Sequence, residues 1–234
     1  MAAQHAVAGD LAFALRFAPR AAKRLNRHVG PLFWYDVTHT SLGCLIDSDY
    51  DMTASIMAEL ASRYRRNQEN LLKLVSDLTD KQIAWTPNKT TPSVGFHVWH
   101  LARWADYLQE LINGRGSQLW EAEGLATQWN METKSLGYAQ TGMEMDEKSA
   151  LALRIPEKGI LLDYARRSFA AAQHAVEKIE DDQFFAVYEC FHGENWHDGH
   201  IGPIVMTWMT HDNRHLGMIE CLIGLQGQSG SADA

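Results

Sequence analysis

Two histidines four residues apart near the C-terminus constrain the fold of this chain more than any other feature. His211 and His215 lie in the stretch MTWMTHDNRHLGMIECLIG, whose apolar residues recur at helical spacing. Four residues make about one helical turn, so both imidazoles project from one face and can bind one ion. A polar ring buried without a partner costs free energy, so the two rings are either hydrogen-bonded in a core or bound to a metal. The paired spacing favours a metal more than a single histidine would, and both interpretations stay open at this point.

The residues around this pair predict a helix that faces a core. Gly202 and Pro203 are typical of a helix start, and the helix is expected to end near Ile223 and Gly224. Steps of three and four connect the histidines to apolar residues on both sides, which predicts one buried stripe. The residues expected in that stripe are Ile204, Trp208, His211, His215, Met218 and Leu222.

The composition is that of one well-filled domain with an extension. The chain has 234 residues, of which 46% are hydrophobic, and a formal net charge of −8. This acidic balance argues against a nucleic-acid surface, so we expect small molecules or proteins as partners. Three scattered cysteines favour a reducing, cytoplasmic compartment over a disulfide framework. No apolar run of about eighteen residues is present, so no membrane span is expected.

Residues 1–51 differ in character from the rest of the chain. Three interpretations fit them: an amphipathic targeting-like segment, an ordered extra element, or an upstream stretch that reflects start-site choice. We favour the last interpretation, with Met52 as the functional start, because regular organisation begins there. His5, His28 and His39 are therefore not expected to be ligands.

Helical periodicity over residues 52–226 predicts an all-α four-helix bundle. Residues 115–155 form a connection long enough to run the length of a bundle, so the second and third helices can be parallel. The link TDKQIAWTPNKTTP is expected to be irregular because it contains two prolines. Residues 227–234 are small and polar and are expected to be disordered. The expected helices span residues 53–77, 93–113, 156–179 and 202–224.

The second of these helices supplies the histidines that can join the C-terminal pair. One row of the helix carries His97, His100 and Trp104, and either histidine can meet the pair. Arg103, Gln109 and Glu110 fall mostly on the side opposite the apolar row. The deepest row is wholly apolar and consists of Val94, Val98, Leu101, Ala105, Leu108 and Ile112.

One histidine from the second helix and two from the fourth provide three imidazoles and leave a coordination position free. That arrangement is typical of a catalytic rather than a structural site. Zinc or nickel suits imidazole ligands best, and iron and manganese are compatible with the ligand type. Asp106 and Asp212 are the carboxylates expected to accept the other ring N–H groups. Trp99, Trp104 and Trp208 can shape a substrate pocket, although aromatic residues at helical spacing are more often plain core.

Other motifs allow different sites. HDNRH has the spacing of the zinc-protease motif HExxH, but Asp212 is one methylene shorter than the usual base, which argues against a protease. The Glu-x-x-His spacing of di-iron bundles occurs twice, but in one glycine-containing segment rather than on two helices. A histidine-rich loop at a pocket mouth is the interpretation that we favour for this segment, with a second metal cluster as the alternative. The residues concerned are Glu189, Cys190, His192, Glu194, His197 and His200.

Two segments resemble the DinB-like superfamily of bacterial four-helix metalloproteins, also called the damage-inducible or YfiT-like fold. TPSVGFHVWHLARWADYL and THDNRHLGMIECLIGLQG carry the resemblance, which covers roughly residues 52–226. It implies an up-down-down-up bundle, often dimeric, with a metal held by one histidine of the second helix and a His-x-x-x-His pair of the fourth. The Trp-His-Leu step places the first ligand at His100 rather than His97, and the pair corresponds to His211 and His215.

The resemblance also implies classes of activity. Members with assigned activities resemble thiol-dependent S-transferases and isomerases, or metal-dependent hydrolases. Many members carry an acid five residues after the second-helix histidine, where this chain has Ala105, and a glutamine three residues after the last histidine, where it has Met218. These differences weaken the inference of a reaction mechanism from the family more than they weaken the inference of a metal site.

From the sequence we therefore expect a cytoplasmic, homodimeric, metal-dependent enzyme. The expected reaction transfers a low-molecular-weight thiol to an electrophile, with the thiol bound to the metal as thiolate. A metal-dependent hydrolase and a non-catalytic metal-binding stress or scaffold protein acting as a dimer are the alternatives. The remaining alternative is a metal-free bundle whose core histidines are hydrogen-bonded. No catalytic residue is assigned.

Overall fold

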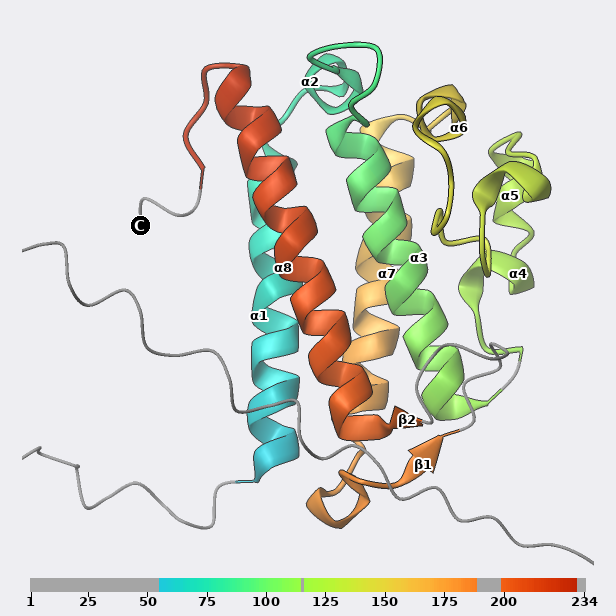
Figure 1. The fold of residues 1–234 in the computed structure, drawn as a ribbon, viewed down its shortest axis with the longest axis vertical. Helices are drawn as coiled ribbons and strands as arrows, with labels where there is room; N and C mark the ends of the chain where they lie inside the picture. The colour runs from blue at the N-terminus through green and yellow to red at the C-terminus, as the bar shows by residue number, and fades with distance from the viewer. Residues whose placement is uncertain (1–54, 115, 189–198, 231–234) are drawn as a thin grey trace, which may run out of the picture. The chain divides into compact units, whose positions relative to one another are not determined.

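The computed structural model describes residues 55–114, 116–188 and 199–230, and four long helices dominate them. Figure 1 shows α1 and α8 running in one direction and α3 and α7 in the opposite one. The predicted all-α fold class is confirmed. The N-terminal extension of residues 1–51 lies outside the described residues and stays a prediction. The long helices are α1 (Ile56–Ser76), α3 (Val94–Asn113), α7 (Lys158–Val176) and α8 (Ile201–Leu225).

Capping residues fix where the helices begin and end. Ser55 and Ser93 precede α1 and α3, and each hydroxyl accepts a hydrogen bond from a backbone N–H of the first turn. Asp181 also accepts from the backbone N–H of Met57 at 2.8 Å, which connects the start of α1 to the segment after α7. Gly114 ends α3 with φ of 101°, a conformation that glycine adopts without strain. The helix ends predicted at Ser93 and Gly114 are confirmed.

Short elements fill the connections. The link before α3, expected to be irregular, contains the helix α2 (Asp80–Ala84), because Thr79 and Gln82 form a capping box that starts it. The long connection after α3 contains the short helical fragments that its length allows. An antiparallel strand pair precedes α8 and sets Val187 opposite His200. These elements are α4 (Leu119–Ala122), α5 (Leu125–Gln128), η1 (Thr133–Leu136), α6 (Glu147–Ala152), η2 (Asp181–Gln183), β1 (Val187–Tyr188) and β2 (Gly199–His200).

The helix α3 is buried on nearly every side. The polar side opposite the apolar row is covered too, since Arg103 is 0% exposed and Gln109 is also buried. The physical reason is the long connection after α3: Figure 1 shows α4, α5 and α6 beside this helix. Arg103 donates to the backbone carbonyl oxygens of Ala139 and Gln140 in that connection. The polar side of this helix is thus covered by the polar groups of the connection after α3 rather than by water.

The buried stripe of α8 also differs in one position from the predicted one. Ile204, Trp208 and Leu222 are buried as expected, but Met218 is 49% exposed, so its predicted burial is wrong. Ile219 is buried instead, because it lies one helical turn after His215 on the side that packs against the bundle. None of the helices in the described segments combines the length and the apolar character needed to cross a bilayer.

Candidate metal centre

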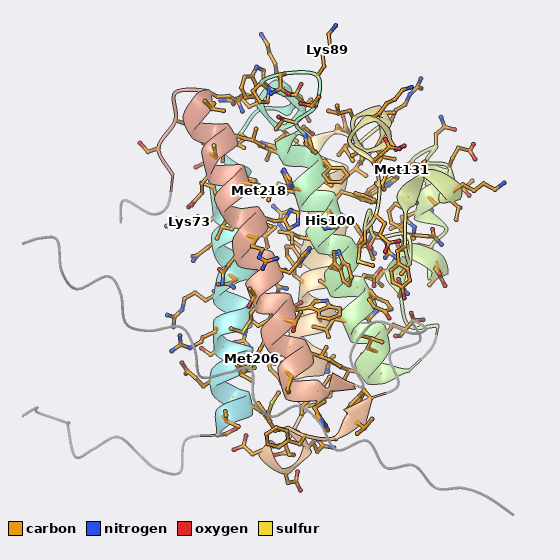
Figure 2. The ribbon with its side chains drawn as sticks, in the orientation of Figure 1. Lys73, Lys89, His100, Met131, Met206 and Met218 are labelled. Carbon is orange, nitrogen blue, oxygen red and sulfur yellow. The ribbon has the colours of Figure 1, made fainter. Side chains whose placement is uncertain are left out.

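His100 lies on α3 (Figure 2). Only 6% of its surface is exposed, and a backbone group fixes the orientation of its ring. Its Nδ1 forms a short hydrogen bond with the carbonyl oxygen of Thr141, in the connection after α3. A carbonyl oxygen only accepts, so Nδ1 carries the proton and Nε2 has the lone pair, which accepts the indole N–H of Trp104 at 3.2 Å. Metal-ligating histidines commonly have this arrangement, in which the other ring N–H donates to a carbonyl group.

A glycine allows this loop to approach the imidazole closely. Gly142 follows Thr141 and has φ of 86°, which side chains of L-residues rarely adopt. A Cβ at this position would lie 3.1 Å from Nδ1 of His100 and 2.8 Å from the ring of Trp99. Any larger residue would therefore push the Thr141 carbonyl away from His100.

His211 and His215 of α8 face His100. The Nε2 atoms of His100 and His211 are 3.1 Å apart, and the ring of His215 lies 4.6 Å and 4.5 Å from these two rings, centroid to centroid. One ring nitrogen of each histidine lies within 4.8 Å of the other two. Zinc–nitrogen bonds of about 2.0–2.1 Å place two ligands of a tetrahedral site about 3.4 Å apart. The three rings thus need only small adjustments to hold one ion.

These imidazoles are neutral at physiological pH. Burial is the main cause, and it lowers the pKa of His211 to about 4 and that of His215 to about 3. The charge of Arg214 contributes to both pKa shifts, and that of His211 to the shift of His215. Burial also lowers the pKa of His100 well below its ordinary value. Only a neutral imidazole offers a lone pair, so this donor set fits a divalent metal such as zinc or nickel.

Asp106 does not support a histidine, contrary to expectation. Its buried carboxylate accepts from Arg103 at 3.0 Å and from the hydroxyl of Tyr164 on α7 at 3.0 Å. It also accepts from the backbone N–H groups of Leu119 and Trp120 at the start of α4. Asp106 therefore joins α3 to α7 and to the long connection, and its role is structural.

Asp212 is also not a partner of the adjacent histidine. Its closest carboxylate oxygen lies 3.9 Å from Nδ1 of His211, which is beyond a hydrogen bond. Burial raises the pKa of the Asp212 carboxyl well above its ordinary value, and Gln68 of α1 offsets part of this shift. Neighbouring residues of a helix project about 100° apart, so Asp212 points towards α1 while His211 points towards α3.

His97 lies beside the three converging histidines without being one of them. It is buried on α3, and its Nδ1 lies 2.9 Å from Nδ1 of His215. Burial is the main cause that lowers its pKa to about 3, and the charge of His215 adds to the effect. The group with converging ligand atoms consists of His100, His211 and His215. The geometry thus makes His97 a hydrogen-bond partner of His215. The spacing of histidines in the sequence does not distinguish this role from that of a metal ligand.

A pocket of about 300 Å³ opens beside His211. Trp208 donates its indole N–H to the backbone carbonyl oxygen of Trp104 at 2.9 Å, and Trp104 donates its own to Nε2 of His100, so both indoles are held at the pocket wall. These two tryptophans line the pocket, whereas Trp99 is core, because it is fully buried against Trp120. The lining residues are Trp104, Met206, Thr207, Trp208, Thr210, His211 and Arg214.

The alternative clusters receive no support from the described residues. His200 is exposed, and its Nδ1 lies 2.5 Å from the carbonyl oxygen of Phe185. The other members of the proposed loop site and of the di-iron motifs lie outside the described residues, so those alternatives stay predictions. They are Glu189, Cys190, His192, Glu194 and His197.

Comparison with known proteins agrees with this architecture. The family model of the DinB superfamily matches residues 63–219. A crystal structure of the conserved protein of a locus from Enterococcus faecalis is similar, with a TM-score of 0.59 and 18% sequence identity. The match covers 72% of this chain and 95% of that one, and at this identity it supports the fold alone. A search of curated proteins gives no match.

Proposed function

This chain belongs to the DinB superfamily, and on that premise we propose that it is a metal-dependent enzyme with His100, His211 and His215 as ligands. The observation that carries the proposal is the convergence of three neutral ring nitrogens within 4.8 Å, beside a pocket that reaches His211. Three imidazoles leave a coordination position for an exchangeable group. Zinc or nickel is the ion that we propose, because both bind neutral imidazole well.

The proposed reaction is the transfer of a low-molecular-weight thiol to an electrophilic small molecule. A divalent cation bound here would lower the pKa of a thiol and so supply a nucleophile at neutral pH. In the transfer, a bond forms between the thiol sulfur and the electrophilic carbon. The bond from that carbon to its leaving group breaks, and the thiol proton passes to water.

The residues that line the pocket favour thiol transfer over hydrolysis. No carboxylate and no lysine belong to the lining within the described residues. Activating water calls for a general base beside the nucleophile, whereas a thiol ionises near pH 8.5 and needs less help. Thr141 holds His100 in the tautomer that keeps the lone pair on Nε2, and the indoles of Trp104 and Trp208 keep one wall of the pocket apolar.

The proposal includes the oligomeric state of the protein and the compartment in which it acts. The resemblance to dimeric relatives supports a homodimer, and the three scattered cysteines support the reducing cytoplasm. Light scattering on the purified chain measures its mass directly. A mass of one chain at micromolar concentration would contradict the dimer without affecting the metal site.

Metal content tests the centre. Untagged protein should contain close to one zinc or nickel ion per chain by plasma mass spectrometry. The variants His100→Ala, His211→Ala and His215→Ala should each lose nearly all of it, because each removes a ligand. His174→Ala is the matched control, since His174 is an exposed histidine of α7. Zinc should raise the unfolding temperature of the native chain and of the control only.

The outcomes separate an enzyme from its alternatives. A native chain that neither contains nor takes up zinc or nickel contradicts the proposal, and the histidines are then polar core residues. A chain that holds the metal but whose cobalt-substituted absorption spectrum ignores added thiols is the metal-binding scaffold instead. A thiol-dependent spectrum together with faster alkylation of the thiol by an added electrophile supports the transferase.

A further inference from the structure

Arg214 places a positive charge in the pocket beside the candidate metal centre. It lies three residues after His211 on α8, so the two side chains are neighbours on one helix surface, and both line the pocket. Arg214 is exposed, whereas the side chain of His211 is 26% exposed. The cation therefore lies towards the mouth of the pocket and the imidazole lies further inside.

The guanidinium of Arg214 is available to a ligand. Among the residues that the structure describes, no carboxylate lies within ion-pair distance of it. Four other arginines each have an acidic partner, which are Arg63, Arg65, Arg103 and Arg167. An arginine that lines a pocket without an internal counter-ion is a natural binding group for a carboxylate, because its planar fork donates two parallel hydrogen bonds.

The other polar groups of the pocket do not compete for this role. Thr207 and Thr210 donate their hydroxyl protons to backbone carbonyl oxygens one turn earlier on α8, each at 2.9 Å. The remaining lining side chains include Met206, Trp104 and Trp208, which offer apolar surface. Within the described lining, Arg214 is thus the strong hydrogen-bond donor, and the rest accommodates an apolar body.

We propose that this pocket binds a small thiol that carries a carboxylate, with the carboxylate on Arg214 and the sulfur directed towards His211. The thiol part of this inference rests on the proposed function, and the carboxylate is the new element. A pocket of about 300 Å³ lies at the lower limit for small-molecule sites, so the ligand is compact.

Calorimetry with a matched pair of thiols tests the inference. The zinc-loaded protein is titrated with 3-mercaptopropionate and with the uncharged 3-mercaptopropionamide. The acid should bind the native chain about tenfold more tightly, as expected for one charge-assisted, bidentate contact. Arg214→Gln should weaken binding of the acid about tenfold and leave that of the amide unchanged. Arg166→Gln, an exposed arginine of α7, should behave as the native chain does.

Each contrary outcome has a separate meaning. Equal binding of the two thiols, or a preference for the acid that survives Arg214→Gln, overturns the carboxylate site and leaves the thiol-transfer proposal standing. No binding of either thiol to zinc-loaded protein overturns both. Arg214→Gln must also retain the native metal content, because Arg214 is not a ligand. If the chain takes up no metal, the titration is made with metal-free protein, where a preference that depends on Arg214 supports the anion pocket and its absence overturns it.

Discussion

At His100, a backbone carbonyl group does what a carboxylate was expected to do. Thr141 lies 41 residues away in the sequence and fixes the proton on Nδ1, while the expected Asp106 is bound to Arg103 and to α4. A carbonyl group cannot lose or gain a proton, so it holds one tautomer over the whole working pH range. The lone pair thereby stays on Nε2, where it accepts the indole N–H of Trp104 at 3.2 Å and where a metal would take the place of that donor.

His97 of α3 should orient His215 of α8 as Thr141 orients His100. Since one Nδ1 of the His97–His215 contact must donate, His97 as acceptor would leave Nε2 of His215 free to bind a metal. Loss of such a partner typically costs about 10–100-fold in metal affinity. His97→Ala should therefore weaken zinc binding by that factor in competition with a coloured chelator, and His97→Gln should restore part of it because an amide can accept.

The control and the spectrum distinguish positioning from ligation. His174→Ala should leave zinc affinity unchanged, and cobalt-substituted His97→Ala should keep the absorption band of the native site. If His97→Ala loses metal as completely as His215→Ala does, His97 is a ligand. If zinc affinity does not change at all, the contact with His215 has no part in metal binding.

Among the elements, α3 is the helix on which the site depends, since it carries His100 and is buried on nearly all sides. Its burial is possible because the polar residues are paired internally. Arg103 donates to Asp106, to Gln118 at 2.7 Å and to backbone carbonyl oxygens of the long connection. A buried ion pair is not by itself strongly stabilising, but removing one partner leaves an uncompensated charge.

Asp106→Ala should therefore destabilise the protein strongly. It leaves the Arg103 guanidinium without its counter-ion and removes the acceptor of two backbone N–H groups at α4, so we expect a loss of about 3–5 kcal/mol in the free energy of unfolding. Urea unfolding measures this change. The control is Asp163→Ala, which removes the exposed partner of Arg167 and should cost no more than about 1 kcal/mol. Similar values for the two variants would show that the buried network is not needed.

For the whole molecule, packing four histidines between α3 and α8 links folding to pH. The pKa of His97 and of His215 is about 3 in the folded chain, and that of His211 is about 4, against 6.5 as the ordinary value. As the pH falls below about 6.5, the unfolded chain takes up protons that the folded chain does not. Each such group costs up to about 1.4 kcal/mol of stability per pH unit until its folded pKa is reached.

The free energy of unfolding of metal-free protein should thus fall as the pH is lowered from about 7 to about 5, as measured by urea unfolding. The double variant His97→Gln/His215→Gln removes two of the titrating groups and should show a shallower dependence on pH. Equal slopes for the native chain and the double variant would contradict the link between this cluster and acid stability.

The sequence by itself determined the helical class, the ends of α3 and the shared face of His211 and His215. These follow from local physics: apolar residues at steps of three and four define a helix face, a serine and a glycine set the ends of α3, and the spacing of His211 and His215 places both rings on one side. Such relations hold within one helix, so they can be read without knowing its neighbours.

Only the tertiary structure decided what surrounds those histidines. The burial of Arg103, the exposure of Met218, the carbonyl of Thr141 on His100 and the place of His97 all depend on which segments pack against α3 and α8. Periodicity gives the face of a helix but not what covers it, and a backbone carbonyl group, which every residue has, leaves no mark in the sequence. Both are set by the packing of distant segments, because the buried polar atoms must find their partners there.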